Sequence, residues 1–239
     1  MSFENNESNE QLIEALDGTT GVYVTLANRV VYEDGSWNTL CLPFGLTNFT
    51  GTPLDGATVH TLSSSEFNNG TLTLNFGDEL SSIEAGKPYL VKWTAGTNVE
   101  NPEFNGVTIS AQKANVTTTY ADFVGIYAPI SIGADGDNTK LFVGANDKLH
   151  YPNGAMNFNA FRAFFSLNGL FVGNESGSGI NNCVLNFGDG TNAVRDLSNL
   201  NSQISNSSDG WFMLDGRQII GKPSVKGIYV CNGRKVVVK

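Results

Sequence analysis

Short apolar runs separated by turn pairs dominate the chain from Val22 onward. The runs are rich in β-branched and aromatic residues and alternate with polar residues about every second position, which is the period of a half-buried strand. Five Asn-Gly and seven Asp-Gly dipeptides lie between or beside the runs. Such pairs favour tight hairpin turns because they tolerate positive φ. The pattern predicts a β-rich chain with less than about a tenth of its residues in helix.

About a dozen strands are predicted in this region, at a spacing typical of a β-sandwich. They are expected at residues 22–26, 29–32, 37–42, 59–62, 71–76, 89–93, 107–110, 123–127, 141–143, 161–165, 170–172 and 183–187. We therefore expect an all-β fold, with a large antiparallel, jelly-roll-like β-sandwich over residues 22–190.

Residues 1–21 differ from this pattern and are expected to form a lead-in with the one helix. Ser8 as N-cap and Gln11 three residues later form a capping box, and Asp17-Gly18 ends the helical pattern. The helix is therefore predicted at residues 8–16.

The last part of the chain divides into a linker and a tail. Residues 191–210 are polar and rich in Ser and Asn, which predicts a linker. Residues 211–239 contain the turn pairs Asp215-Gly216 and Asn232-Gly233. These pairs predict two small β-hairpins, formed by residues 211–214 with 217–220 and by residues 228–231 with 234–238. A segment this short buries too little surface to fold alone, so we expect it to dock on the body or on a partner.

Charge separates the tail from the rest of the chain. Residues 211–239 carry six basic residues and one acidic residue, whereas residues 1–210 carry 8 basic and 22 acidic residues. The cationic tail is interpreted either as an address or anchor that another component recognises, or as the last strands of the body's own sheet.

Three motifs follow one another in the tail: Leu214-Asp215-Gly216-Arg217, then Lys226-Gly227-Ile228-Tyr229-Val230, then residues 232–239. In this order and position they resemble the C-terminal segment of large exported surface proteins of the Bacteroidota, which is similar to a type IX secretion sorting domain. In the body, DGSWNTLCLPF (34–44), IEAGKPYLVKW (83–93) and FRAFF (161–165) resemble the last non-repetitive domain of such proteins, often found after leucine-rich repeats or other modules.

The resemblance implies a secreted or cell-surface protein of which this chain is a C-terminal fragment, with secretion machinery as a partner of the tail. It assigns a sorting role to the tail residues Leu214, Asp215, Gly216, Arg217, Gly227, Tyr229, Asn232, Gly233 and Lys235.

Composition argues against several other classes of protein. A net charge of −9, with no basic stripe outside the tail, argues against a nucleic-acid partner because phosphate neutralisation supplies most of that affinity. No stretch reaches the roughly 20 apolar residues that cross a bilayer. No apolar segment with a basic residue before it lies near Met1, so no signal peptide is predicted, in keeping with a fragment.

No metal or cofactor site is predicted. Cys41, Cys183 and Cys231 are far apart, and the first two lie in apolar runs, which predicts small buried hydrophobic side chains; one disulfide stays an open alternative. The loop at residues 133–138 has two carboxylates and an amide that could bind Ca²⁺. It lacks the following glutamate of a calcium loop, so an Asx-type turn is preferred.

Catalytic groups are sparse, and we expect no enzymatic activity. No Gly-x-Ser-x-Gly motif accompanies the two histidines, His60 and His150, and His60 is expected to face solvent from a strand. The carboxylates considered for a glycoside hydrolase lie beside glycines in turns: Glu33, Asp34, Asp78, Glu79 and Glu84.

Three side chains are candidate ligand contacts. Trp37 and Trp93 suit either stacking on a sugar or packing in the core. Arg162 interrupts the aromatic run at residues 161–165, and it needs a structural partner unless it binds a sugar or carboxylate ligand. The main hypothesis is a non-enzymatic C-terminal module of a surface protein. The alternatives are a carbohydrate-binding, lectin-like module for a glycan or host-surface ligand, and a glycoside hydrolase.

Two short sequences recur. Leu-Asn-Phe-Gly-Asp occurs at residues 74–78 and 185–189, and Leu-Phe-Val-Gly occurs at residues 141–144 and 170–173. No fixed period connects them, so they are interpreted as one local solution, a strand that ends in glycine, reached several times, with symmetric positions in two sheets as the alternative.

Overall fold

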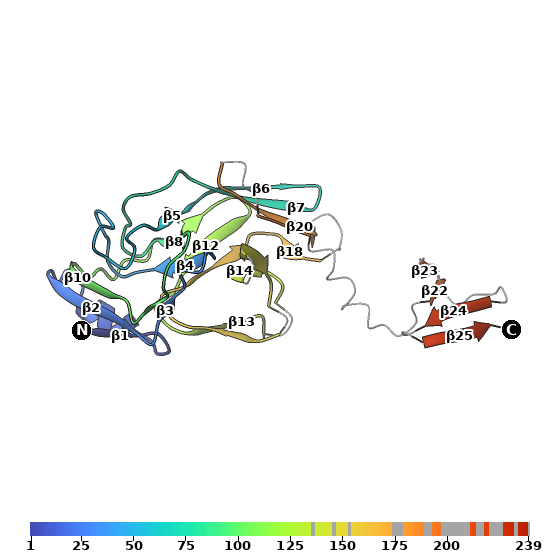
Figure 1. Ribbon diagram of the computed structural model, residues 1–239, viewed down its shortest axis with the longest axis horizontal. Coiled ribbons are helices and arrows are strands. Elements are labelled where there is room, and N and C mark those ends of the chain that lie inside the picture. The colour runs from blue at the N-terminus through green and yellow to red at the C-terminus, as the bar shows by residue number, and fades with distance from the viewer. Residues whose placement is uncertain are drawn as a thin grey trace. The chain divides into compact units, whose positions relative to one another are not determined.

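The computed structural model describes residues 1–134, 137–144, 147–152, 154–173, 179–188, 193–196, 211–213, 218–219, 227–231 and 234–238. The chain divides into two compact units, Met1–Leu197 and Ser198–Lys239. The fold is mostly β, with 45% strand and one short helix in the part described, which confirms the predicted class and the low helix content. The strands form several small sheets (Figure 1).

The N-terminal residues belong to the core of the first unit. Strand β1 (Ser2–Glu4) pairs in parallel with β2 (Val22–Ala27), and β10 (Glu103–Val107) pairs with the other side of β2. Phe3 of β1 is fully buried, and so is Ile13 of the single helix α1 (Glu10–Ala15). The expected lead-in therefore supplies part of the core.

The helix begins later than predicted, because Asn9 and not Ser8 is its N-cap. The Asn9 side chain makes no capping bond. Its Oδ1 instead accepts a hydrogen bond from Glu4 N, and its Nδ2 donates to Tyr127 O. Tertiary contacts of Asn9 thus replace the capping box expected at Ser8.

Two further sheets continue the body. The antiparallel sheet β4-β8-β5 contains β4 (Asn38–Cys41), β8 (Pro88–Lys92) and β5 (Thr58–His60). Strand β3 (Val30–Val31) pairs with β9 (Val99–Glu100). A large hydrophobic cluster joins residues of these sheets to the N-terminal sheet, with the aromatic side chains Phe3, Phe44, Phe104, Tyr89, Tyr127 and Phe161 among its members.

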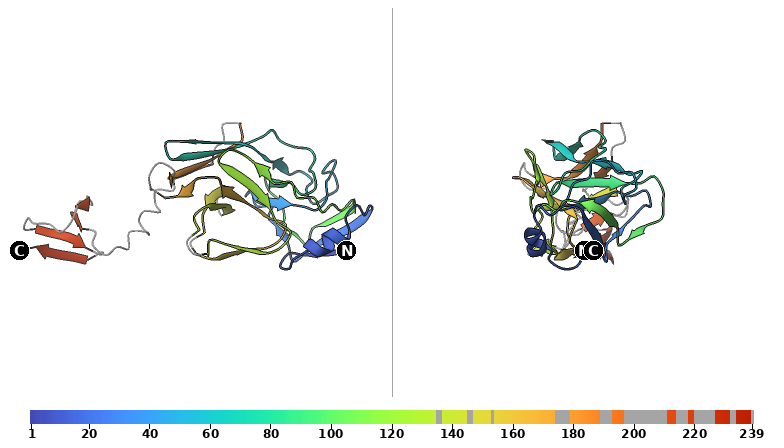
Figure 2. Two further views of the ribbon diagram at one scale, coloured as in Figure 1. Left: turned by 180° about the vertical axis from the view of Figure 1, so that it is seen from behind. Right: turned by 90° about the vertical axis from the view of Figure 1, so that its left-hand side faces the viewer.

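A five-stranded sheet in the order β11-β12-β17-β14-β15 forms another part of the body. Its strands are β11 (Val116–Thr117), β12 (Ala121–Gly125), β14 (Lys140–Gly144), β15 (Lys148–His150) and β17 (Ala163–Leu167). Two small pairs complete this region: β13 (Ile130–Ile132) with β16 (Met156–Phe158), and β18 (Phe171–Val172) with β19 (Gly179–Ile180). Figure 2 shows the same strands from behind and from one end.

The Leu-Asn parts of the two repeated sequences lie side by side in one sheet, ordered β21-β20-β7-β6. Its strands are β6 (Leu62–Asn68), β7 (Thr71–Phe76), β20 (Asn182–Asn186) and β21 (Ala193–Asp196). Strands β7 and β20 run parallel and in register, with Leu74 opposite Leu185 and Asn75 opposite Asn186. Asn186 Nδ2 donates to Asn75 Oδ1 over 2.8 Å, and the Phe76 and Phe187 rings stack with centroids 5.0 Å apart. The alternative of symmetric positions in two sheets is therefore wrong for this pair, because both copies belong to one sheet.

The tail forms a four-stranded antiparallel sheet in the order β23-β22-β24-β25. Its strands are β22 (Trp211–Met213), β23 (Gln218–Ile219), β24 (Gly227–Cys231) and β25 (Arg234–Val238). Both predicted hairpins are present as strand pairs, and β22 additionally pairs with β24. In the predicted linker, β21 pairs with β20. The polar composition of residues 191–210 concealed this edge strand, which needs backbone hydrogen bonds rather than apolar side chains.

Most predicted strands are present, with shifted ends, and two differ for a local reason. The strand expected at residues 107–110 is instead β10, where Gly106 has φ 69° and the register shifts between Phe104 and Val107. The strand expected at residues 161–165 begins at Ala163, because Phe161 has φ 59°, outside the β region.

Candidate functional site

A pocket of about 360 Å³ lies where the β2–β3 turn, β4, β14 and β16 meet, and we call it the arginine pocket. Two arginines and several aromatic and amide side chains line it. The lining residues are Arg29, Tyr32, Trp37, Asn38, Thr39, Phe142, Val143, Gly144, Met156, Asn157, Phe158, Asn159 and Arg162.

Arg29 is positioned by a tight turn. Asn28 before it has φ 60°, a conformation that asparagine tolerates better than most residues. Asn28 N donates to Asn101 Oδ1, and Asn101 N donates to Arg29 O. The Arg29 side chain is only 4% exposed, and its Nη2 donates to Thr39 O over 3.0 Å. Its buried Nε has no hydrogen-bond partner in the part of the chain that the structure describes.

Arg162 also follows a residue with left-handed backbone. Phe161 has φ 59°, which is rare for a bulky side chain and costs conformational energy. Phe161 is held there by full burial and by the bonds from Phe161 N to Ile126 O and from Cys41 N to Phe161 O. Arg162 is half-buried, and its Nη1 donates to Asn5 Oδ1 and to Ala160 O. Uncharged acceptors therefore hold both pocket arginines.

Neither arginine has a carboxylate partner among the described residues. Three lysines do have such partners: Lys87 with Glu84, Lys92 with Asp147 and Lys113 with Glu10. Desolvation by burial, and secondly the charge of the other arginine, lower the pKa of Arg29 to about 9. Desolvation by burial likewise lowers the pKa of Arg162. Arg29 is still charged at pH 7, so the pocket concentrates positive charge that no carboxylate of the described residues pairs with.

Tyr32 and Trp37 supply aromatic surface at the pocket. The Tyr32 side chain is 49% exposed. Trp37 is half-buried and well fixed: its N donates to Asp147 Oδ1, Phe187 stacks on its ring at 4.8 Å, and Lys92 Nζ lies 5.4 Å from its ring centroid. Tyr32 is therefore the more accessible surface for a flat ligand.

The three candidate ligand contacts from the sequence separate into two groups. Trp37 and Arg162, far apart in the chain, both line the arginine pocket. Trp93 is 4% exposed, and its Nε1 donates to Asp55 O, so it belongs to the core. Sequence reasoning missed Arg29. The available signal was an arginine directly after an asparagine at a predicted strand boundary.

His60 was expected to face solvent, and this was wrong. It is buried, and its Nδ1–H donates to Gly77 O over 2.8 Å. Its ring contacts those of Trp37 and Phe187. His60 supports the aromatic group behind the pocket without lining it.

The sorting residues predicted in the tail lie partly on strands. Gly227 and Tyr229 are on β24, opposite Val238 and Val236, and Lys235 is on β25, opposite Val230. The other six lie outside the described residues: Leu214, Asp215, Gly216, Arg217, Asn232 and Gly233.

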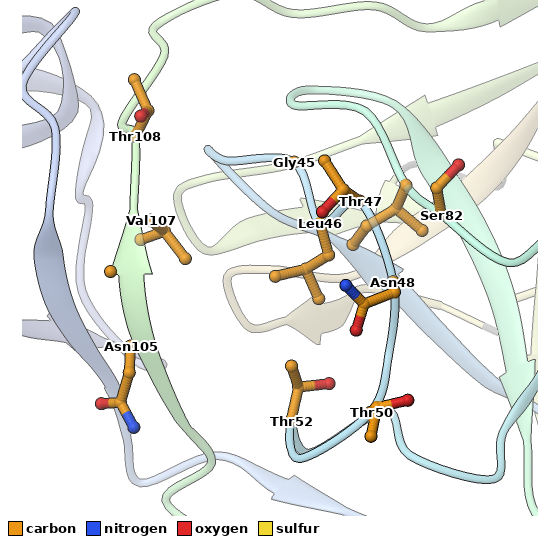
Figure 3. A pocket seen from close by; sticks show the side chains of 12 residues that line it. Gly45, Leu46, Thr47, Asn48, Thr50, Thr52, Ser82, Asn105, Val107 and Thr108 are labelled. Atoms are coloured by element: carbon orange, nitrogen blue, oxygen red, sulfur yellow. The ribbon is translucent and has the colours of Figure 1, made fainter.

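A larger hollow, the polar cleft, has a volume of about 740 Å³. Asn105, Val107 and Thr108 of the β10 region face Leu46, Asn48 and nearby loop residues across it (Figure 3). Its lining consists of Gly45, Leu46, Thr47, Asn48, Thr50, Thr52, Ser82, Ile83, Asn105, Gly106, Val107 and Thr108. Because this lining has hydroxyls and amides but neither a charged nor an aromatic side chain, it offers less specific recognition than the arginine pocket.

The remaining sites considered from the sequence show structural roles. Cys41 and Cys183 are buried free thiols, as predicted, and burial raises the pKa of each to about 12. Asp137 Oδ1 accepts a hydrogen bond from Thr139 N, which is an Asx-type turn. Within the described ranges, no group of three or more His, Cys, Asp or Glu side chains could hold a metal ion.

Comparison of the chain with protein-family models, with curated proteins and with solved structures finds no match. A search of the described residues finds no helix that is both long and apolar enough to span a bilayer. The functional argument therefore depends on the geometry of the arginine pocket.

Proposed function

We propose that the chain is a non-enzymatic, β-rich module of a secreted or cell-surface protein and that it binds a glycan in the arginine pocket. The observation that carries this proposal is the combination of an exposed aromatic ring, Tyr32, with amide and guanidinium donors in one concave site. Aromatic surface packs against the apolar face of a sugar, while amides and hydroxyls bind sugar hydroxyls.

The lining supports recognition rather than hydrolysis. The amide side chains Asn38, Asn157 and Asn159 and the hydroxyl of Thr39 surround the arginines. The lining includes neither a carboxylate nor a histidine, whereas a glycoside hydrolase uses two carboxylates that flank the scissile bond. The pocket thus supplies groups that orient a sugar without a general acid or base to cleave it.

A pair of tyrosine variants tests the glycan-binding role. We expect Tyr32→Ala to weaken binding on a glycan array and in titration calorimetry by about 10-fold or more, because removing an aromatic contact of about 1.5 kcal/mol costs a factor of ten. Tyr23→Ala is the matched control, because Tyr23 is 67% exposed on β2 and lies outside the pocket. Equal binding by both variants would place the ligand elsewhere.

The tail is proposed to serve export or attachment through the secretion machinery. The support is its separate four-stranded sheet, together with its cationic composition on an acidic chain. A reporter fused to residues 198–239 should reach the surface of a host with type IX secretion. The same fusion lacking residues 234–239 should stay in the periplasm, because it loses strand β25. Equal surface display of both fusions would refute a sorting role.

The arrangement of the body as a single jelly-roll-like sandwich is part of the same proposal. Its support is the predominance of antiparallel pairing and the alternation of buried and half-buried residues, as along β7 and β12. The parallel pair of β7 and β20 departs from a purely antiparallel sandwich.

A further inference from the structure

Arg29 has hydrogen-bond donors without a partner in the part of the chain that the structure describes. A guanidinium has five N–H donors, and the hydrogen bond that the Arg29 side chain makes to a described residue goes to Thr39 O. Its Nε is buried without a partner among the residues described. Buried polar groups are almost always paired, so this unpaired Nε adds to the cost of burying the Arg29 charge. The Nε itself is closed off from the pocket, and because Arg29 lines the pocket, an arriving group would be met by its terminal Nη donors.

The positive charge of the pocket also favours a ligand that carries a negative charge. The chain has 23 acidic residues against 14 basic ones, so carboxylates are abundant, yet none lines the pocket. Two guanidinium groups share the site, and the charge of Arg162 disfavours the charged form of Arg29. A bound anion would relieve this repulsion and the cost of burial together.

The backbone holds both arginines in place at some conformational cost. Asn28 and Phe161, the residues directly before them, both have left-handed φ. Such conformations cluster at ligand-binding positions, where the surrounding structure maintains them. Here burial of Phe161 and the bonds between residues 28–29 and Asn101 provide that support.

We propose that the sugar bound in the arginine pocket carries a carboxylate, as uronic and sialic acids do, and that Arg29 and Arg162 bind it. This inference rests on the proposed function. A carboxylate fits because its two oxygens accept parallel N–H bonds from the planar guanidinium fork. Phe142, Phe158 and Met156 beside the arginines make the surroundings apolar, which strengthens a charged hydrogen bond. The ring of the sugar then lies within reach of Tyr32 and the lining amides.

The test compares matched sugars by titration calorimetry with the full chain. One pair is trigalacturonic acid and its methyl ester, which removes the charge but keeps the sugar rings. A second pair is sialyllactose and lactose, and sulfated lactose is a third probe that carries a different anion. We expect one of the acids to bind at least ~30-fold more tightly than its neutral counterpart. This factor is the loss of affinity that is typical when one partner of a buried charge pair is removed.

Arginine variants locate the effect. Arg162→Gln should reduce binding of the acid to the level of its neutral counterpart, and Arg162→Lys should restore only part of it, because lysine keeps the charge without the fork. Lys148→Gln is the control, because Lys148 is exposed and lies outside the pocket. Thermal unfolding of each variant checks that the fold is retained, and the lysine variant decides the matter if the glutamine variant unfolds.

The outcomes separate this inference from the proposed function. Acid and neutral sugars that bind equally, or an acid that binds Arg162→Gln as well as the unmodified protein, would overturn the carboxylate and leave glycan binding in place. Preference for the sulfated sugar over both acids would overturn it as well. Failure of every acidic and neutral sugar to bind would overturn both proposals.

Discussion

Replacing Arg29 with methionine should make the protein more stable. The side chain is 4% exposed, carries a charge at neutral pH and has no carboxylate partner among the described residues. Burial lowers the pKa of Arg29 from the usual guanidinium range to about 9, which corresponds to roughly 5 kcal/mol of unfavourable free energy for the charged form, at about 1.36 kcal/mol per pH unit. Methionine fills a similar volume with a flexible apolar chain.

The expected gain is smaller than this figure, because the variant also loses a contact. Without Arg29, the carbonyl of Thr39 loses the donor that lies 3.0 Å away, which costs about 1–3 kcal/mol when the acceptor stays buried. The difference between these two figures leads us to expect that Arg29→Met raises the free energy of unfolding by about 2–4 kcal/mol. In a chain of this size that is a rise in Tm of about 2–4 °C per kcal/mol.

Urea unfolding at several pH values measures this effect and its cause. Because the pKa is lower in the folded state, the unfolded chain binds more protons between pH 9 and 12.5, and the unmodified protein recovers the lost stability as pH rises through this range. The advantage of Arg29→Met should thus be full at pH 7–8 and shrink above pH 9. Lys148→Met, at an exposed position, should change stability by less than about 0.5 kcal/mol. A loss of stability in Arg29→Met at pH 7.5 would show that Arg29 is a satisfied structural residue and would refute the reasoning.

Three further predictions follow from contacts in the body. Gly125→Ala should destabilise the fold by about 1–3 kcal/mol, because a Cβ there would lie 2.2 Å from Cys41 Sγ; chemical denaturation measures this, and a double variant with Cys41→Ala should recover part of the loss. Cys41 and Cys183 should resist iodoacetamide at pH 8 in the folded protein, since burial raises the pKa of both thiols to about 12 and only the thiolate reacts; labelling of either within minutes, read by peptide mass spectrometry, would contradict this. Asn186→Ala should lower the free energy of unfolding, measured with urea, by about 1 kcal/mol, because it removes the 2.8 Å hydrogen bond to Asn75. Asn105→Ala is the control and should be close to neutral, because the Asn105 side chain has no hydrogen bond among those described.

The β class and most strand positions could be predicted from the sequence because they depend on local period and on turn residues. The starts of the helix and of strand β17 could not, because both depend on contacts far away in the chain. Asn9 is held by Glu4 and Tyr127, and Phe161 by Ile126 and Cys41. Such pairings leave no periodic signal.

The candidate site was partly predictable for the same reason. Arg162 and Trp37 could be identified because an arginine and a tryptophan in apolar strands are unusual individually. Arg29 could not, since its importance comes from burial and from the missing carboxylate, which are properties of the assembled pocket. His60 was misassigned because alternation along a strand predicts which residues share a face, but it does not predict which face is covered by other parts of the protein.

The parallel pairing of the two Leu-Asn-Phe sequences also sets the order in which the protein can fold. Asn75 and Asn186 are 111 residues apart, so β7 gains its second neighbour only after nearly the whole body has been synthesised. Contacts at such separation form slowly because the chain must first close a long loop. Until β20 arrives, β7 has β6 on one side and a free edge of N–H and C=O groups on the other, and free edges recruit strands from other molecules. A chain that stops before residue 182 keeps that edge open and is therefore expected to aggregate, whereas the completed body closes it with its own second copy of the same sequence.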